Sequence, residues 1–227
     1  TRYIGVTGVQ TCALPIYNAF WNGGQMVYGD GRALHGFTGA LDVIAHELTH
    51  GVTQYTVPPS GLLYAGQPGA LNESVSDVFG VQVVQWHLGQ DVTQADWLIG
   101  ATLGLPDGKP LRSLASPKDG YDPQPDDMKD FVILPNDEPD DWGGVHTNSG
   151  IPNHAFYLMA MDRGGHSWET VGPVWYRALA ALREKPSATF SQFAAATIDV
   201  ARQMSSGPKA ALATTVRNAW KKVGVAR

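Results

Sequence analysis

Cysteine is nearly absent from this chain of 227 residues, and long apolar runs are missing altogether. A single cysteine, Cys12, cannot form a disulfide within the chain. No run reaches the roughly 18 apolar residues of a membrane-spanning helix, so we expect no membrane partner. Basic residues are also few, since 16 Lys and Arg stand against 21 Asp and Glu. Nucleic-acid-binding proteins normally carry a basic face, so we expect no nucleic-acid partner either.

What the sequence does contain is typical of a folded protein. Hydrophobic residues make up 43% of the chain and charged residues 16%, a balance that argues against disorder. The 26 glycines and 15 prolines predict many turns between regular elements. A chain of this length can bury one large core or two smaller ones.

Residues 1–16, TRYIGVTGVQTCALPI, differ in character from the rest of the chain. Translation of a common short-read sequencing adapter gives Val6 to Ile16 codon by codon, so we expect residues 1–16 to be an adapter-derived artefact. The alternative is a genuine apolar strand. A secretory signal peptide fits less well, because its charged, apolar and small-residue regions are not in order. On the adapter interpretation Cys12 is foreign, and the natural chain begins upstream of Tyr17.

Hydrophobic periodicity predicts a mainly helical protein. Residues 17–39 are rich in glycine and aromatic residues and predict extended segments and turns. Residues 104–141 predict a long irregular stretch, with nine acidic residues between Asp119 and Asp141. Apolar residues recur at helical spacing in segments 41–53, 70–88, 147–162, 167–182, 189–204 and a last one that starts near Pro208.

The segment His46-Glu47-Leu48-Thr49-His50 matches the HExxH zinc motif. Residues four apart lie on one face of a helix, so the imidazoles of His46 and His50 can share one Zn²⁺. Glu47 lies beside that face, where it can reach a metal-bound water. From the pentapeptide alone, an exposed polar helix face is the alternative interpretation.

A catalytic zinc site needs a third protein ligand. The metzincin subclass would place a histidine at position 56, which is Thr56, and is therefore excluded. Glu73 on the next predicted helix offers a carboxylate ligand. Asp77 follows four residues later on the same face, where it can accept a hydrogen bond from a zinc-bound imidazole.

Five ordered motifs resemble one known family, the thermolysin-like zinc metallopeptidases, and within it the protealysin-like branch. They are NAFWNG, MVYGDG, DVIAHELTHGVT, GALNESVSDVFG and GGVHTNSGIPNHAFYL, and the resemblance runs from about Tyr17 almost to the C-terminus. It implies a mainly α fold, the helical C-terminal lobe of such a peptidase. Residues 17–38 would be a short β remnant of the N-terminal lobe, and residues 39–227 the active-site helix and helical lobe. Val27, Tyr28 and that helix are expected to expose apolar surface.

The resemblance also implies a role for each matching residue. It implies a zinc endopeptidase in which a zinc-bound water is activated by Glu47. The implied set is zinc on His46, His50 and Glu73, oxyanion donors Tyr64 and His146, orienting carboxylates Asp77 and Asp141, and substrate-backbone contacts from Asn18, Arg112 and the edge that begins at Ala19.

The pocket for the residue after the scissile bond would be lined by Leu34, Phe37, Val43 and Leu111. All four are apolar, so the resemblance predicts cleavage before bulky apolar residues. The alternative is that these four residues simply belong to the core. The implied partner is a peptide or protein substrate of a monomeric, extracellular enzyme.

Several alternatives stay open at this point. A paired calcium site is doubtful, because Asp42 is present but Val84 stands where an acid is needed. A solvated loop is favoured over a Ca²⁺ site in residues 119–141. A zinc aminopeptidase shares HExxH and a downstream glutamate but lacks a motif for a free amino terminus. The chain could also be a non-catalytic zinc-binding domain or an inert truncated fragment.

Overall fold

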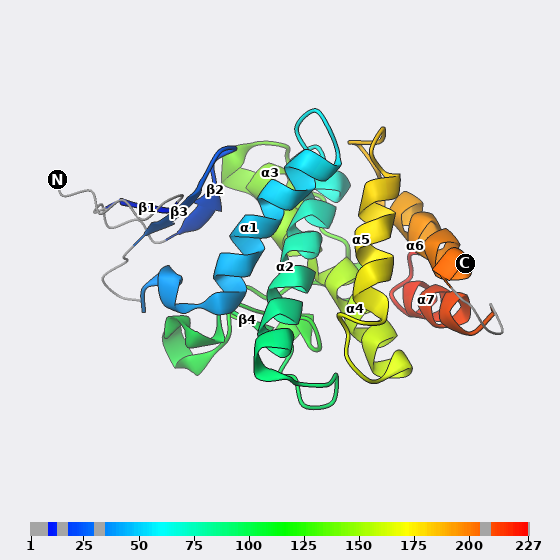
Figure 1. Cartoon of the computed structure of the whole chain (residues 1–227). Helices are drawn as coiled ribbons and strands as arrows, with labels where there is room; N and C mark the ends of the chain where they lie inside the picture. Colours follow the sequence, from blue (N-terminus) through cyan, green and yellow to red (C-terminus); the bar gives the residue numbers. More distant parts are fainter. Residues whose placement is uncertain (1–8, 13–17, 30–34, 205–209, 227) are drawn as a thin grey trace.

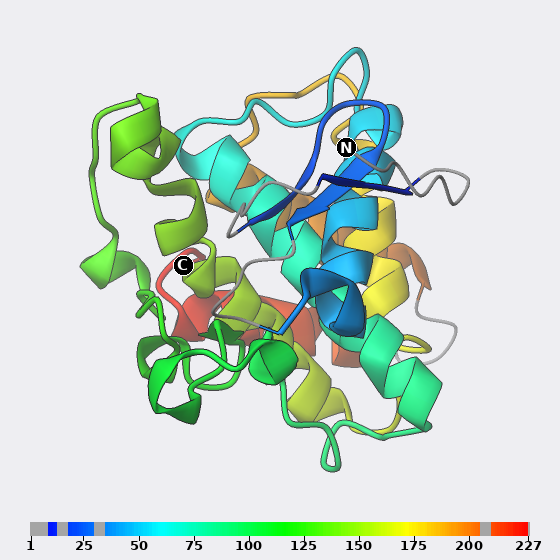
Figure 2. The ribbon, with the colours of Figure 1, turned by 90° about the vertical axis from the view of Figure 1, so that its left-hand side faces the viewer.

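Helices dominate the computed structural model, which describes residues 9–12, 18–29, 35–204 and 210–226 (Figure 1). The predicted mainly α fold is thereby confirmed. Two long central helices, α1 (Leu41–Thr56) and α2 (Gly66–Leu88), lie side by side in both views (Figures 1 and 2). The other helices are α3 (Asp141–Asn148), α4 (Gly150–Arg163), α5 (Val171–Ala181), α6 (Phe190–Met204) and α7 (Ala210–Lys222).

The long helices stand in a row across the molecule. In Figure 1 the helices α1, α2 and α5 stand next to each other, with the N-terminal strands beyond α1 and the α6–α7 pair beyond α5. The last predicted helix is present as α7, while Pro208, its expected first turn, lies outside the described residues. The core of this lobe contains Trp175, which stacks on Trp220 with ring centroids 5.6 Å apart.

Helices α1 and α2 approach closely because α2 carries glycine at their contact. A Cβ atom at Gly80 would lie 2.8 Å from the carbonyl oxygen of Asp42. Such a distance is shorter than van der Waals contact, so glycine is what lets the two backbones meet. This contact sets the distance between the helices that carry the HExxH motif and Glu73.

A small sheet lies on the other side of α1. Strand β3 (Met26–Gly29) is central, with β1 (Val9–Cys12) parallel to it and β2 (Ala19–Trp21) antiparallel. The predicted short β segment before α1 is therefore present. Strand β1 falls within residues 1–16, and a strand conformation does not reveal the origin of its codons, so the adapter interpretation stays a prediction.

Strand β2 forms an edge of the sheet and is fastened to α1. The indole Nε1 of Trp21 donates a hydrogen bond of 2.8 Å to the side-chain oxygen of Gln54. A Cβ atom at Gly51 would lie 3.1 Å from the Trp21 ring, so this glycine leaves room for the indole. The free edge of β2 is thereby held beside the helix that carries His46 and His50.

The expectation that Tyr28 exposes apolar surface is wrong. Tyr28 is only 1% exposed, because its ring packs in a small cluster with Ala19, Phe37 and Val43. The exposed apolar surface instead lies on α1, where Leu48 is 52% and Tyr55 74% exposed. The apolar periodicity that predicted this helix therefore marks an outward-facing stripe.

Residues 104–140 are irregular, as predicted. The exception is the strand β5 (Arg112–Ser113), which lies within this stretch and pairs in a short hairpin with β4 (Leu98–Ile99). Beyond β5 the described backbone forms only single turns of 3₁₀ helix up to Asp141. Within the described residues the 3₁₀ turns are Phe37–Gly39, Ala101–Leu103, Pro106–Gly108, Pro117–Asp119, Met128–Asp130 and Glu138–Asp140. In the described part of the chain, no helix is both long and apolar enough to cross a membrane.

Candidate metal centre and active site

The two histidines of the HExxH motif and Glu73 converge on one point. The Nε2 atoms of His46 and His50 are 3.0 Å apart. The Glu73 carboxylate places one oxygen 3.3 Å from His46 Nε2 and the other 3.5 Å from His50 Nε2. Two imidazole nitrogens and a carboxylate oxygen are a ligand set that Zn²⁺ prefers.

The chemistry of these groups fits a bound cation. Glu73 is fully buried, and its Oε2 has no hydrogen-bond partner among the described residues. Burial raises the pKa of Glu73, but the imidazoles of His146, His50 and His46 outweigh burial and hold the pKa well below its usual range. A buried carboxylate that stays ionised needs a positive partner, and the predicted zinc would provide one.

A hydrogen bond orients each of the two imidazoles from behind. The Nδ1 atom of His46 lies 2.8 Å from Asp77 Oδ1, as the sequence predicted. The Nδ1 atom of His50 lies 3.0 Å from Asn72 Oδ1, a partner that the sequence analysis missed. With Nδ1 as the donor in both rings, each Nε2 keeps its lone pair for a metal. A signal was available, since Asn72 directly precedes Glu73, the predicted third ligand.

The glutamate of the motif, the predicted general base, lies in the same cavity as the predicted metal ligands. Glu47 is 5% exposed and lines a cavity of about 390 Å³ together with His46, His50 and Glu73. It is the neighbour of His46 on α1, so the helix directs it beside the metal ligands. Its carboxylate can therefore face a water molecule in that cavity.

Tyr64 and His146 line the same cavity. The Tyr64 hydroxyl donates a hydrogen bond of 2.6 Å to Glu73 Oε1, and it lies 3.4 Å from His146 Nε2. Burial, followed by the negative charge of Glu73, raises the pKa of Tyr64 above its ordinary value. The hydroxyl therefore keeps its proton near neutral pH and can serve as a donor.

Asp141 orients His146 through both of its oxygens. Its Oδ1 lies 2.6 Å from His146 Nδ1, and its Oδ2 accepts the backbone N–H groups of His146 at 2.9 Å and Thr147 at 3.1 Å. Burial raises the pKa of Asp141, but the hydrogen bond to His146 outweighs it and lowers the pKa. The sequence-predicted pairing is thus present.

The backbone before His146 is left-handed for four residues. The φ angles of Asp141, Trp142, Gly143 and Gly144 are 55°, 50°, 82° and 77°. Glycine adopts this conformation freely, whereas a tryptophan does so only at a cost. The turn brings the Asp141 carboxylate back over the start of the helical turn that carries His146.

Gln124 holds the same loop from the other side and was not predicted. Its Nε2 donates to the carbonyl oxygen of His146 at 2.6 Å and to the Ser149 hydroxyl at 2.8 Å. The side chain is only 2% exposed. Nothing in the sequence indicated this role, because residue 124 lies in the irregular stretch and meets His146 only in the fold.

Arg112 makes a two-pronged contact with Asp77. Its Nε lies 2.8 Å from Oδ2 and its Nη2 lies 2.6 Å from Oδ1. The same Oδ2 accepts a hydrogen bond of 2.8 Å from Asn153, a further residue that the sequence did not indicate. Arg112 is 6% exposed but lines the adjacent cavity, so its predicted contact with a substrate backbone stays a prediction.

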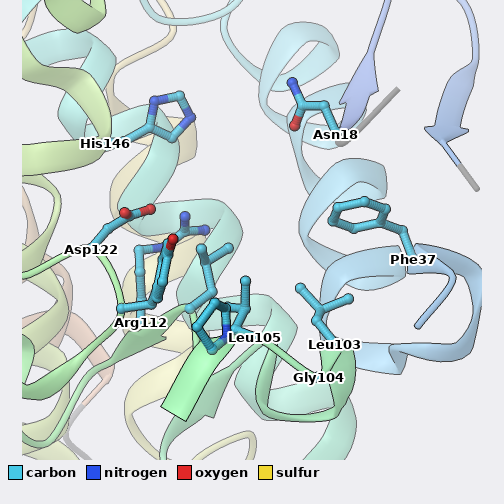
Figure 3. Close-up of a pocket in the computed structure, with 11 residues that line it drawn as sticks. Asn18, Phe37, Leu103, Gly104, Leu105, Arg112, Asp122 and His146 are labelled. Atoms are coloured by element: carbon cyan, nitrogen blue, oxygen red, sulfur yellow. The ribbon is translucent and has the colours of Figure 1, made fainter. Parts of the chain in front are cut away.

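A second cavity, of about 620 Å³, opens next to the metal centre. Figure 3 shows Phe37 and Leu103 on one side of it, Arg112 and Asp122 on the other, and Asn18 and His146 at its upper rim. Leu105 and Leu111 complete its apolar lining.

The predicted specificity residues are only partly at this cavity. Phe37 and Leu111 line it, whereas Val43 is 5% exposed and packs in the cluster behind Phe37. Leu34 lies outside the described residues. Leu103 and Leu105 take part instead, and the sequence analysis missed both because they belong to the irregular region after β4.

The start of β2 lies at the mouth of both cavities. Asn18 lines each of them, and its side-chain oxygen accepts the N–H of Ala19 at 2.9 Å. Ala19 is 9% exposed and lines the cavity that holds Glu47. The predicted substrate contacts of these two residues are therefore possible from where they stand.

The acidic residues of the irregular stretch mostly have partners. Asp126 lies 2.8 Å and Asp130 3.4 Å from the Lys118 ammonium group. Asp127 and Asp137 accept backbone N–H groups at the starts of 3₁₀ turns. These contacts support the solvated-loop interpretation, and a calcium site stays doubtful.

Comparison with known proteins gives two family matches. The description "Thermolysin metallopeptidase, alpha-helical domain" matches residues 60–225, and "Thermolysin metallopeptidase, catalytic domain" matches residues 5–54. The second match begins within the segment for which an adapter origin is predicted.

Two similar proteins and one solved structure extend the comparison to individual relatives. An "Extracellular metalloprotease" of Pectobacterium carotovorum is 50% identical and "Protease PrtS" of Photorhabdus is 42% identical, each over 92% of this chain. The chain spans 60% and 57% of the lengths of these two relatives. The solved precursor of protealysin from Serratia proteamaculans is 46% identical, with a TM-score of 0.83 over 93% of this chain and 66% of its own. The chain therefore belongs to the thermolysin family of metallopeptidases.

Proposed function

We propose that this chain acts as a zinc-dependent endopeptidase that hydrolyses peptide bonds before bulky apolar residues. The observation that carries the proposal is the convergence of His46, His50 and Glu73 within 4.8 Å, with Glu47 in the same cavity. A metal site with three protein ligands and an open side is the arrangement of catalytic rather than structural zinc.

The residues around the site supply the steps of peptide hydrolysis. Zn²⁺ at this site would polarise a scissile carbonyl and acidify a water molecule. Glu47 would take the proton of the attacking water and pass it to the leaving amine. Both transfers are within reach of one carboxylate that faces a shared cavity.

Tyr64 and His146 would stabilise the negative oxygen of the tetrahedral intermediate. Both line the cavity that also contains Glu47, and the raised pKa of Tyr64 keeps its hydroxyl protonated. Asp141 and Gln124 hold His146 in place before substrate arrives. Preorganised donors of this kind each contribute roughly 10²–10³ in rate.

The substrate would bind as an extended strand along β2. The free edge of that strand begins beside the metal ligands, and Asn18 and Arg112 flank the path toward the apolar cavity. Phe37, Leu103, Leu105 and Leu111 make that cavity a place for a bulky apolar side chain. This lining supports cleavage before such residues.

The relatives also support proposals about the substrate and the location of this chain. Peptides or proteins are the proposed substrates, and secretion is proposed because one relative is named an extracellular metalloprotease. A monomer is the proposed state. A zinc aminopeptidase is less well supported, since the sequence lacks a motif for a free amino terminus.

The test is hydrolysis of an unstructured peptide library by the full chain loaded with Zn²⁺, with and without a zinc chelator. We expect chelator-sensitive cleavage before Leu, Phe and Ile, abolished in a Glu47→Ala variant that still binds one zinc. Zinc binding without cleavage would favour a non-catalytic zinc domain. Neither zinc binding nor cleavage would favour an inert fragment.

A further inference from the structure

Residues 101–109 line the larger cavity without belonging to an α-helix or a β-strand. The cavity of about 620 Å³ is lined by four residues of this segment, Leu103, Gly104, Leu105 and Pro106. The regular structure of the segment is limited to the 3₁₀ turns Ala101–Leu103 and Pro106–Gly108. The hydrogen bonds of these turns are local, so the position of this wall depends on its contacts with the rest of the protein.

His35 reaches this wall from outside with three contacts. Its backbone N–H donates to the carbonyl oxygen of Leu103 at 2.8 Å. Its ring Nδ1 lies 3.0 Å from the carbonyl oxygen of Thr102, and because a carbonyl oxygen can only accept, Nδ1 is the donor. The ring also covers Gly104, where a Cβ atom would lie 3.3 Å from Cε1 and 3.4 Å from both ring nitrogens. His35 therefore holds three successive residues of the wall.

The glycine at position 104 makes room for this imidazole. Its φ angle of 71° lies in the left-handed region, which a residue with a Cβ atom adopts only at a cost. A Cβ atom there would also crowd the His35 ring. The backbone conformation and the missing side chain of Gly104 therefore both favour the contact between His35 and the wall.

Further hydrogen bonds fasten the chain just before and just after this wall. Before it, the N–H of Gly100 donates to the buried Asp42 carboxylate. After it, the N–H of Tyr121 donates to the carbonyl oxygen of Pro110 at 2.8 Å. Within the part of the chain that the structure describes, the hydrogen bonds that join residues 101–109 themselves to the rest of the protein all come from His35. Its loss would leave the middle of the wall held by packing alone.

His35 also links the wall to a second segment of the cavity lining. It stands two residues before Phe37, which lines the same cavity and packs with Leu103 in one buried cluster. Figure 3 shows the Phe37 ring above Leu103, with Leu105 farther along the wall. His35 therefore couples the position of Leu103 and Leu105 to that of Phe37, and these are apolar side chains that an incoming side chain would touch.

We propose that His35 is a positioning residue that sets the width of the apolar cavity. The width then determines how strongly a large apolar side chain is preferred over a small one after the scissile bond. This inference rests on the proposed endopeptidase function. A large side chain gains from the wall only where the two touch, because a gap of about 1 Å forfeits up to half of a dispersion contact. A small side chain reaches little of the wall, so its position matters less.

Two substitutions separate the contacts of His35. His35→Ala removes the imidazole, and with it the bond to Thr102 and the cover over Gly104, but it keeps the backbone bond to Leu103. His35→Asn restores a side-chain N–H at about the place of Nδ1, so the side chain can again donate to Thr102. The matched control is His87→Ala, because His87 is an exposed histidine that lines neither cavity of the site.

The experiment measures hydrolysis of two peptides by the zinc-loaded full chain. The peptides differ only in the residue after the scissile bond, which is leucine in one and alanine in the other. We expect His35→Ala to lower the leucine-to-alanine ratio of kcat/KM roughly tenfold, the low end of what one methylene contact is worth in an apolar pocket. KM for the leucine peptide should rise, whereas kcat for the alanine peptide should stay unchanged. His35→Asn should recover most of the ratio, and His87→Ala should keep all of it.

The outcomes separate this inference from the proposed function. A wild-type leucine preference that His35→Ala leaves unchanged overturns the role of His35 alone, and so does an equal loss of kcat/KM for both peptides. Cleavage without a leucine preference in the wild type overturns the proposed preference and this role. No cleavage of either peptide overturns the proposed function, and this role with it. Thermal unfolding shows whether each variant is folded. If His35→Ala is not, Gly104→Ala, whose Cβ would crowd the same ring, must lower the ratio in its place.

Discussion

One carboxylate oxygen of Asp77, Oδ1, contacts both His46 and Arg112. Its Oδ1 lies 2.8 Å from His46 Nδ1 and 2.6 Å from Arg112 Nη2. Burial raises the pKa of Asp77, but the Arg112 guanidinium and the hydrogen bond to His46 outweigh it and hold the pKa well below its usual range. The orientation of His46, a predicted metal ligand, and the placement of Arg112 at the adjacent cavity are therefore coupled through one carboxylate.

Replacing Asp77 by asparagine should weaken zinc binding. The variant removes the charge that fixes the His46 ring, and loss of such a partner typically costs about 10–100-fold in metal affinity. Competition with a chelator of known affinity measures the effect. Asp126→Asn, which alters an exposed pair with Lys118, is the matched control and should leave the affinity unchanged. Equal affinities in both variants would contradict this role of Asp77.

Removing Arg112 should change how the stability of the zinc-free protein depends on pH. A lowered folded-state pKa of Asp77 adds stability above the unfolded-state value of about 3.9, and this contribution is lost as the pH falls through the folded-state pKa. We therefore expect Arg112→Met to cost about 3–5 kcal/mol at pH 7, with a smaller difference below about pH 4.

Urea unfolding between pH 3 and pH 7 in the presence of a chelator measures that difference. Arg202→Met removes the exposed pair with Asp199 and should cost less than about 1 kcal/mol. A cost for Arg112→Met that stayed constant down to pH 3 would show that the guanidinium does not act through Asp77.

Asn72 should matter for zinc although it carries no charge. It is the hydrogen-bond partner of His50, so Asn72→Ala leaves that imidazole free to rotate or to change tautomer. We expect roughly a tenfold loss of zinc affinity by the same competition method. Asn22→Ala, in an exposed turn, is the control. A result within twofold of the wild type would mean that α1 alone orients His50.

Tyr64→Phe tests the proposed oxyanion donor. Loss of the hydroxyl should lower kcat by roughly 10²–10³ with little change in KM, because the donor acts only in the transition state. Tyr176→Phe removes the hydroxyl of an exposed tyrosine that lines neither cavity of the site and should have no effect. A rise in KM at unchanged kcat would assign Tyr64 to substrate binding instead.

Gly80→Ala should destabilise the protein even though alanine favours helix. The added Cβ would lie 2.8 Å from the Asp42 carbonyl oxygen, and forcing α1 and α2 apart costs about 1–3 kcal/mol. Thermal unfolding measures the loss. Gly39→Ala meets no atom within 4 Å and is the control. Equal stability of the two variants would show that the helix contact can adjust.

Local sequence signals account for most of the fold. Apolar spacing predicted the long helices because their buried faces repeat with the helical period, as in the α2 residues Leu71, Val75 and Val78. The start of α3 was not predicted, since its first four residues are left-handed and no apolar period marks such a turn. On α1 the apolar spacing correctly predicted a helix, but the apolar stripe faces outward rather than into the core.

The candidate site also contains residues that local spacing predicts and residues that meet only in the fold. His46, Glu47, His50, Glu73 and Asp77 follow from spacing along two helices, so the sequence alone places them. Asn72, Gln124 and Asn153 escaped prediction because amides are common and their partners lie far away along the chain. The cavity was harder still, because Leu103 and Leu105 come from an irregular segment whose course depends on the whole fold.

The left-handed turn at Asp141–Gly144 reverses the hand of the backbone for about one turn. A residue of mirror-image configuration prefers the conformation that Trp142 is made to adopt, because inversion at Cα also inverts the allowed φ and ψ. Chemical ligation of a D-tryptophan at this position should therefore relieve strain, whereas a D-residue at a described helical position with negative φ would add strain. The loop that aims His146 is thus a place beside the predicted metal site where the protein would accept the opposite chirality.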